Sequence, residues 1–113
     1  MTDTNSTTNR IAELNDMLRK TFFAGGRVVM TQGIRALPEA DQSAIREKVE
    51  TFDDFGEDND PYGEHDFGSF EHASHKVFWK IDYYDPSLTF GSEDPADPAK
   101  TCRVLTIMLA EEY

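Results

Sequence analysis

The chain has a single cysteine, Cys102, and no long apolar run. One cysteine forms neither an internal disulfide nor a zinc site with several thiolates, so we expect Cys102 to be a buried, reduced thiol. No apolar stretch approaches the roughly 20 residues that a membrane span requires. The start MTDTNSTTNR also lacks the apolar stretch of a signal peptide. These absences predict a cytoplasmic protein with no membrane partner.

Positive charge is scarce in the second part of the sequence. Residues 51–113 hold 15 Asp and Glu against 4 Lys and Arg, whereas residues 1–50 hold 7 of each kind. The formal charge of −11 therefore belongs to residues 51–113. Proteins that grip phosphates need clustered Lys and Arg, so the composition argues against direct binding of nucleic acid or anionic lipid. It favours a basic protein or a metal cation as partner.

The densest run of carboxylates covers residues 53–66, called the acidic segment below, and it contains no Lys or Arg. Aromatic residues interleave it, whereas disordered acidic tracts are poor in them. We interpret the segment as a fixed acidic surface; the competing interpretation is a solvated face that keeps a small protein soluble. The predicted partner-binding residues are Asp53, Asp54, Glu57, Asp58, Asp60, Tyr62, Glu64, Asp66, Tyr83 and Tyr84.

Changes in the spacing of apolar residues along the sequence indicate where helices and strands lie. Residues 1–8 are predicted to be disordered, and residues 9–113 to form a single globular domain. Apolar residues at steps of three and four predict two helices, the first ended by Gly25-Gly26 and the second begun by Pro38. The predicted helices cover residues 9–23 and 38–52.

Four further runs are typical of strands. Two of them, 27–31 and 102–109, are apolar enough to predict central strands buried on both faces. Gly33 is expected to form a bulge, residues 72–75 a hairpin loop and residues 87–100 a long loop. The remaining strands cover residues 64–71 and 76–84. We therefore predict an α+β fold in which two N-terminal helices pack on a mostly antiparallel sheet of about four strands, in the order helix-strand-helix-strand-strand-strand.

Several long sequence motifs resemble an uncharacterised bacterial family, domain of unknown function 3768. They are NDPYGEHDFG at 59–68, FWKIDYYD at 78–85, SEDPADP at 92–98 and RVLTIMLAEEY at 103–113, with NDMLR at 15–19 and GRVVMTQGI at 26–34. The resemblance implies no activity. It does imply an origin typical of alphaproteobacteria, often on plasmids and other mobile elements, and this context favours counter-defence or plasmid upkeep.

The main functional hypothesis is a binding protein without catalysis or cofactor. Rigid carboxylates can meet the Lys and Arg residues with which another protein grips phosphates. The chain would then inhibit or decoy a basic nucleic-acid-binding host defence complex in the manner of a DNA mimic, as anti-CRISPR or anti-restriction proteins do.

Two alternatives stay open. A small metal-assisted hydrolase would use Glu64, His65 and Asp66, with Asp82 on a neighbouring strand. A dimeric accessory protein of plasmid maintenance would instead need an exposed apolar patch for a homodimer.

The spacing of carboxylates and histidines along the sequence tests whether the chain could bind a metal ion. A calcium loop starting at Asp58 has Tyr62 and Ser69 at required ligand positions, so the EF-hand template fails. A looser divalent site would use Asp58, Asp60 and Glu64, and a zinc site would use His65, His72 and His75.

Overall fold

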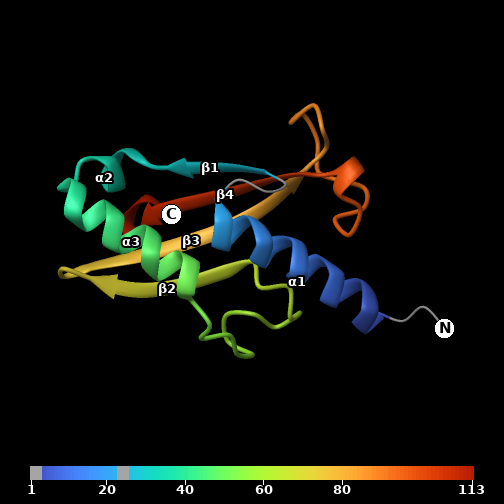
Figure 1. Ribbon diagram of the computed structural model, residues 1–113, viewed down its shortest axis with the longest axis horizontal. Coiled ribbons are helices and arrows are strands. Elements are labelled where there is room, and N and C mark those ends of the chain that lie inside the picture. The colour runs from blue at the N-terminus through green and yellow to red at the C-terminus, as the bar shows by residue number, and fades with distance from the viewer. Residues whose placement is uncertain (1–3, 23–25) are drawn as a thin grey trace.

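The computed structural model describes residues 4–22 and 26–113, which form an α+β fold (Figure 1). The strands are β1 (Gly26–Met30), β2 (Phe67–His72), β3 (His75–Tyr84) and β4 (Cys102–Leu109). They form one sheet with the strand order β1-β4-β3-β2. β1 runs parallel to β4, and the other two pairings are antiparallel. The predicted mostly antiparallel sheet is therefore confirmed.

The two long helices, α1 (Thr4–Thr21) and α3 (Glu39–Thr51), lie on the same face of the sheet (Figure 1). α3 matches the predicted helix, whereas α1 begins five residues before its predicted start and includes residues 4–8, which were expected to be disordered. Extending a helix that has already formed requires far less free energy than starting one, so polar residues can join it. Of the predicted stop, Gly25 lies outside the described residues and Gly26 opens β1.

Short elements complete the chain and correct one prediction. Gly33 does not form a bulge but lies in the short helix α2 (Gln32–Arg35). A Cβ atom at Gly33 would lie 2.5 Å from Glu112 Oε1, so the close approach of the C-terminal residues explains the glycine. The two 3-10 helices are η1 (Pro98–Lys100) and η2 (Ala110–Glu112).

β1 is an edge strand, which corrects its predicted central position. Its side chains alternate between half-buried and exposed, and Val29 is 45% exposed. A run of apolar β-branched residues indicates a strand but does not say how many neighbours the strand has. β4, in contrast, lies between β1 and β3 and is the central strand that its sequence predicts.

The β2–β3 hairpin is tighter than its sequence indicates. His72 and His75 pair with each other, so the turn consists of Ala73 and Ser74 alone, both with positive φ. Two-residue turns with positive φ match the twist of the paired strands. At its other end β2 begins at Phe67, three residues later than predicted.

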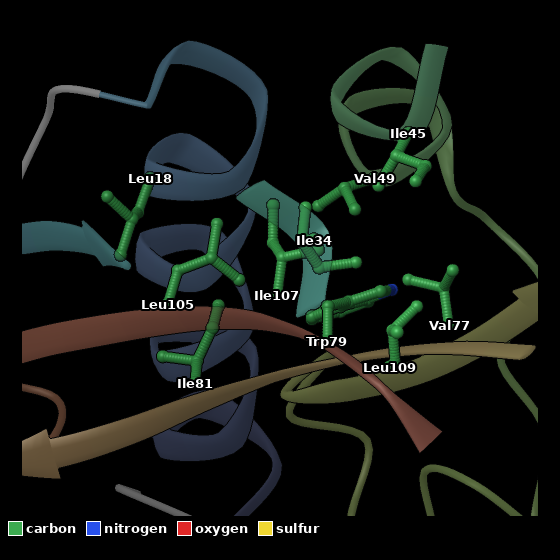
Figure 2. Close-up of a cluster of buried hydrophobic side chains, with 10 residues drawn as sticks. All are labelled: Leu18, Ile34, Ile45, Val49, Val77, Trp79, Ile81, Leu105, Ile107 and Leu109. Atoms are coloured by element: carbon green, nitrogen blue, oxygen red, sulfur yellow. The ribbon is translucent and has the colours of Figure 1, made fainter. Parts of the chain in front are cut away.

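The core lies between the sheet and the two long helices (Figure 2). Residues at alternate positions of β3 point into it, as predicted, and Trp79 at its centre is fully buried. No helix in the described part of the chain combines the length and apolar character needed to cross a bilayer. The core residues are Leu18, Ile34, Ile45, Val49, Val77, Trp79, Ile81, Leu105, Ile107 and Leu109.

The contact between Gly68 and Trp79 gives a first prediction. A Cβ atom at Gly68 would lie 2.5 Å from Trp79 Nε1 and 2.8 Å from the Phe52 ring. Gly68→Ala should therefore lower the free energy of unfolding by about 1–3 kcal/mol, as overpacked cores do. Urea denaturation measures the change. Gly56→Ala is the matched control, because the nearest atom to a Cβ atom there lies 4.0 Å away. Equal stability of the two variants would contradict the packing.

Candidate functional site

The acidic segment leaves the end of α3 and packs back against the core. The Phe55 ring meets the edge of Trp79 with their centroids 6.1 Å apart, and it stacks on the His65 ring at 4.0 Å. Asn59 closes the intervening turn, because its Oδ1 accepts from the Gly56 amide at 2.8 Å and its Nδ2 donates to the Asp54 carbonyl at 3.0 Å. Aromatic packing and local hydrogen bonds therefore both brace the segment.

Asp60 supports the acidic segment from within. Its side chain is buried, and its Oδ1 accepts from the backbone amides of Glu64 at 2.9 Å and His65 at 3.1 Å. His65 adopts a left-handed conformation with φ 56°, and its Nε2 lies 3.9 Å from Asp60 Oδ2. The carboxylate thus draws Glu64 and His65 into a turn, which explains why β2 begins only at Phe67.

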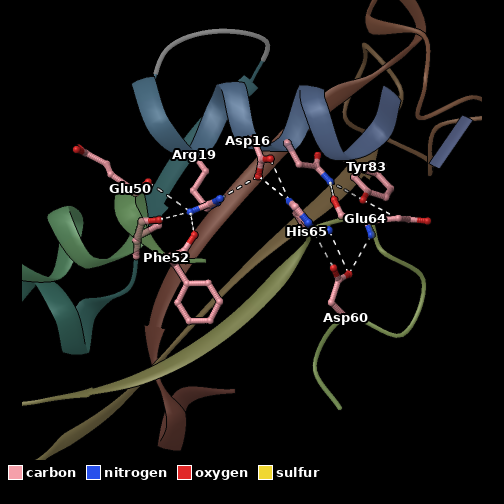
Figure 3. Close-up of polar contacts among 10 residues, drawn as sticks. Asp16, Arg19, Glu50, Phe52, Asp60, Glu64, His65 and Tyr83 are labelled. Carbon is pink, nitrogen blue, oxygen red and sulfur yellow. Dashed lines mark hydrogen bonds and ion pairs between the residues drawn. The ribbon is translucent and has the colours of Figure 1, made fainter. Parts of the chain in front are cut away.

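A buried arginine connects α1, α3 and the acidic segment (Figure 3). Arg19 Nη1 donates to the carbonyls of Val49 and Phe52, both at 2.7 Å, at the C-terminal end of α3. Its Nη2 donates to Asp16 Oδ1 at 2.9 Å, and Asp16 Oδ2 lies 3.0 Å from Nδ1 of His65. One carboxylate therefore joins the buried guanidinium to the imidazole.

A second set of polar contacts runs from β4 to the same loop. Arg103 Nε donates to Asn15 Oδ1 at 2.7 Å, and Asn15 Nδ2 donates to the Glu64 carbonyl at 2.9 Å and to the Tyr83 hydroxyl at 2.8 Å. The Tyr83 hydroxyl donates in turn to Glu64 Oε1 at 2.7 Å. Burial and the Glu64 carboxylate raise the pKa of Tyr83, and burial lowers the pKa of Arg103. Arg103 also donates to the Pro95 carbonyl.

Sequence reasoning did not identify Asn15, Arg19 or Arg103 as internal polar anchors. The signal in the sequence that could have identified two of them is the helical spacing of Asn15 and Arg19. Asn15 and Arg19 follow Ile11 at successive steps of four, which places them on the apolar side of α1. All three side chains are almost completely buried. A polar residue on the buried side of a helix indicates a specific partner, because an unpaired polar group is costly there.

The structure separates the predicted partner-binding residues into exposed and internal groups. Asp60 is buried, and Glu64, Asp66, Tyr83 and Tyr84 are half-buried, with Tyr83 and Tyr84 on opposite faces of the sheet. Tyr62 is 79% exposed. The remaining four carboxylates are exposed and form what we call the acidic ridge: Asp53, Asp54, Glu57 and Asp58.

The acidic ridge keeps its charge unpaired. Within the described residues, no Lys or Arg forms an ion pair with any of its four carboxylates. Three of them, Asp54, Glu57 and Asp58, line a shallow hollow of about 290 Å³ together with Phe52 and Ser69. The ridge is thus an exposed group of anions on a braced segment.

Asp66 and Asp82 of the hydrolase hypothesis line one hollow, but Glu64 and His65 are turned to other partners. Glu64 turns to Tyr83, and His65 turns to Asp16 and stacks on Phe55. Asp82 forms an ion pair with Lys80 at 2.8 Å.

Neither of the two metal sites that the sequence leaves possible is assembled. Asp60 and Glu64 are held by internal hydrogen bonds, and His72 contacts Asp41 and Lys48, away from the contacts of His65. In the two described stretches, residues 4–22 and 26–113, no group of three or more His, Cys, Asp and Glu side chains has the arrangement needed to hold a metal ion.

Asp66 gives a pH-dependent prediction. Burial, together with the charge of Glu64, raises the pKa of the Asp66 carboxyl above its ordinary 3.8. The folded protein therefore binds this proton more tightly than the unfolded chain, so ionisation destabilises the fold as the pH rises through the raised value. Asp66→Asn should raise the Tm at about pH 7, and by less at about pH 4. Thermal melting followed by circular dichroism measures both.

Asp85→Asn is the control of opposite sign. Hydrogen bonds from Ser87 and from the Thr89 amide lower the pKa of Asp85, so its charge stabilises the fold above the ordinary pKa. This variant should have a lower Tm at about pH 7. A Tm of Asp66→Asn at or below that of the parent protein would contradict the assignment.

Comparison with known proteins identifies the family of this chain. No curated protein and no solved structure matches the chain. The sequence model of a family described as "Protein of unknown function (DUF3768)" matches residues 30–112. The match confirms the resemblance carried by the sequence motifs, and the chain belongs to the DUF3768 family.

Proposed function

We propose that the chain is an acidic binding protein, without catalysis or cofactor, that occupies the phosphate-binding surface of a basic protein or nucleoprotein complex. The observation that carries the proposal is the acidic ridge, whose four carboxylates are exposed and have no Lys or Arg partner among the described residues. Such anions offer a nucleic-acid-binding protein the charges that it normally finds on phosphates.

The bracing of the acidic segment makes such binding efficient. A flexible acidic tail loses conformational entropy when it binds, whereas a segment already held by Phe55, Asn59 and Asp60 loses less. Exposed charges mainly steer the encounter and set the orientation, and they do so most strongly at low salt. Tyr62, which lies within the segment and is 79% exposed, supplies an aromatic contact of the kind that dominates binding energy.

The internal arginines do not neutralise the acidic ridge by direct contact. Arg19 and Arg103 are almost completely buried and bond to α1, α3 and the loops, so their charges lie inside the protein. Neither guanidinium forms an ion pair with the acidic ridge, so a basic partner meets the carboxylates of the ridge unpaired.

The finer part of the proposal concerns the biological role. The family resemblance implies an association with mobile elements, and a cytoplasmic DNA-mimic-like inhibitor of a host defence complex, of anti-CRISPR or anti-restriction type, fits both that context and the acidic ridge. The hydrolase alternative has weaker support, because Glu64 and His65 are turned to separate internal partners.

Matched charge variants test the proposal. The test variant carries Asp54→Asn, Glu57→Gln and Asp58→Asn, all on the acidic ridge. The control carries Glu39→Gln, Glu47→Gln and Glu111→Gln, which lie on exposed positions elsewhere and remove the same net charge. Each protein is immobilised and exposed to a lysate of an alphaproteobacterium, and bound proteins are eluted with salt or with duplex DNA.

The expected result is capture of a nucleic-acid-binding protein that both salt and duplex DNA release. The ridge variant should lose at least about tenfold in affinity, whereas the control should stay close to the parent protein. Equal capture by the two variants, or capture that duplex DNA does not displace, would overturn the proposal.

A further inference from the structure

Two of the predicted partner-binding residues, Tyr62 and Asp66, line one hollow, which we call the tyrosine hollow. Its volume is about 320 Å³, at the lower limit for small-ligand pockets, so it has room for a single side chain. Lys80 and Asp82 also line it, and they alternate with the core residues of β3, so they point away from the side of the sheet that α1 and α3 cover (Figure 1).

Aromatic side chains give the tyrosine hollow its first affinity for a cation. Tyr62, Phe67 and Tyr113 all line it. Tyr62 is 79% exposed and Tyr113 is 73% exposed, so both side chains are largely free to contact a ligand. The face of an aromatic ring attracts a cation, and a planar guanidinium can also stack on it.

Asp66 supplies a carboxylate that no cation of this chain satisfies. Within residues 4–22 and 26–113, no Lys or Arg forms an ion pair with it. The ammonium of Lys80 is already paired, because its Nζ lies 2.8 Å from Asp82 Oδ2. Burial and the charge of Glu64 raise the pKa of Asp66, so its ionisation costs stability, and carboxylates with such a cost occur preferentially at functional sites.

The buried arginines of this protein show which group satisfies aromatic rings and a carboxylate together. Arg19 Cζ lies 5.4 Å from the ring centroid of Phe55, and its Nη2 donates to Asp16 at 2.9 Å. Arg103 Cζ lies 5.3 Å from the ring centroid of Tyr83. The tyrosine hollow presents the same kinds of group, and no arginine of the described residues lines it.

The tyrosine hollow adjoins the acidic ridge. Asn59 lines both the tyrosine hollow and the shallow hollow formed by Asp54, Glu57 and Asp58 of the ridge. A basic partner that covers the acidic ridge can therefore reach the tyrosine hollow as well.

We infer that the tyrosine hollow binds an arginine side chain of the basic partner, with its guanidinium stacked on a tyrosine ring and hydrogen-bonded to the Asp66 carboxylate. The inference rests on the proposed function for the identity of the partner. Arginine fits better than lysine, because its planar fork can stack on a ring and donate to both carboxylate oxygens. The acidic ridge then steers the encounter, and the hollow supplies a partly desolvated contact that fixes the position of the partner.

A peptide with one arginine tests the tyrosine hollow apart from any partner. Acetyl-Gly-Arg-Gly-amide is titrated into the protein at low salt, and NMR chemical shifts follow the backbone amides of residues 62–67 and the rings of Tyr62 and Tyr113. We expect saturable shifts with a dissociation constant in the millimolar range, as suits a single side chain. The same peptide with uncharged citrulline should bind at least about tenfold more weakly, and the lysine peptide at least about threefold more weakly.

Variants of the hollow identify the groups that bind the guanidinium. Asp66→Asn removes the charge with little change in size and should weaken binding of the arginine peptide at least about fivefold. The same substitution is expected to raise the Tm at about pH 7, so unfolding does not account for the loss. Glu47→Gln removes one charge from an exposed position of α3 and should leave binding unchanged.

Tyr62 provides a second pair of variants. Tyr62→Ala should weaken binding about fivefold, whereas Tyr62→Phe keeps the ring and should bind like the parent protein. Tyr62 is 79% exposed, so neither change disturbs the core.

Four results would overturn the inference: shifts confined to the acidic ridge, equal binding of the arginine and citrulline peptides, equal binding of the arginine and lysine peptides, or equal binding by Asp66→Asn and Glu47→Gln. Its failure is distinguishable from that of the proposed function, which is tested by capture through the acidic ridge. Capture that the ridge variant loses, without peptide binding, overturns the hollow alone. Peptide binding without capture from the lysate overturns the proposed function and keeps the hollow as an arginine site.

Discussion

The buried guanidinium of Arg19 is the interaction on which the arrangement of this protein depends. It donates to the carbonyls of Val49 and Phe52 at the C-terminal end of α3, where regular helical hydrogen bonding ends, and it lies 5.2 Å from the ring centroid of Trp79. Packing of α1 on the sheet would be possible with an apolar residue at this position. A guanidinium carries several hydrogen-bond donors, so besides packing it holds the carbonyls at the point where the chain leaves α3.

This constraint determines where the acidic carboxylates lie. The acidic segment begins one residue after Phe52, and Asp16 extends the contact from Arg19 to His65 at the far end of the segment. Both ends are thus attached to α1, and Asp60 supports the turn between them. The carboxylates of the acidic ridge are left outside these contacts. The same interactions that satisfy buried polar groups therefore expose the unpaired anions.

The sequence predicts those features that depend on local patterns. The alternation of Val77, Trp79 and Ile81 identifies a half-buried strand, and the apolar run from Cys102 to Leu109 coincides with β4. What it misses depends on residues far apart in the chain. The edge position of β1 follows from its parallel pairing with β4, whose residues lie 77 positions later in the chain. Gly26 pairs with Arg103 at one end of this register, and Met30 pairs with Ile107 at the other.

The same distinction applies to the candidate site. The acidic ridge can be predicted from the composition, because a run of acidic residues is recognised in a sequence without knowledge of its contacts. Asp60 has the same chemistry as its neighbours in the sequence, yet it turns inward to the amides of Glu64 and His65. The roles of Asp60, Asn15 and Arg103 depend on hydrogen-bond partners that cannot be identified from the neighbouring sequence. Two arginines are thus bonded inside the protein while the four carboxylates of the acidic ridge stay exposed, and the electrostatic contact that we propose would use this separation.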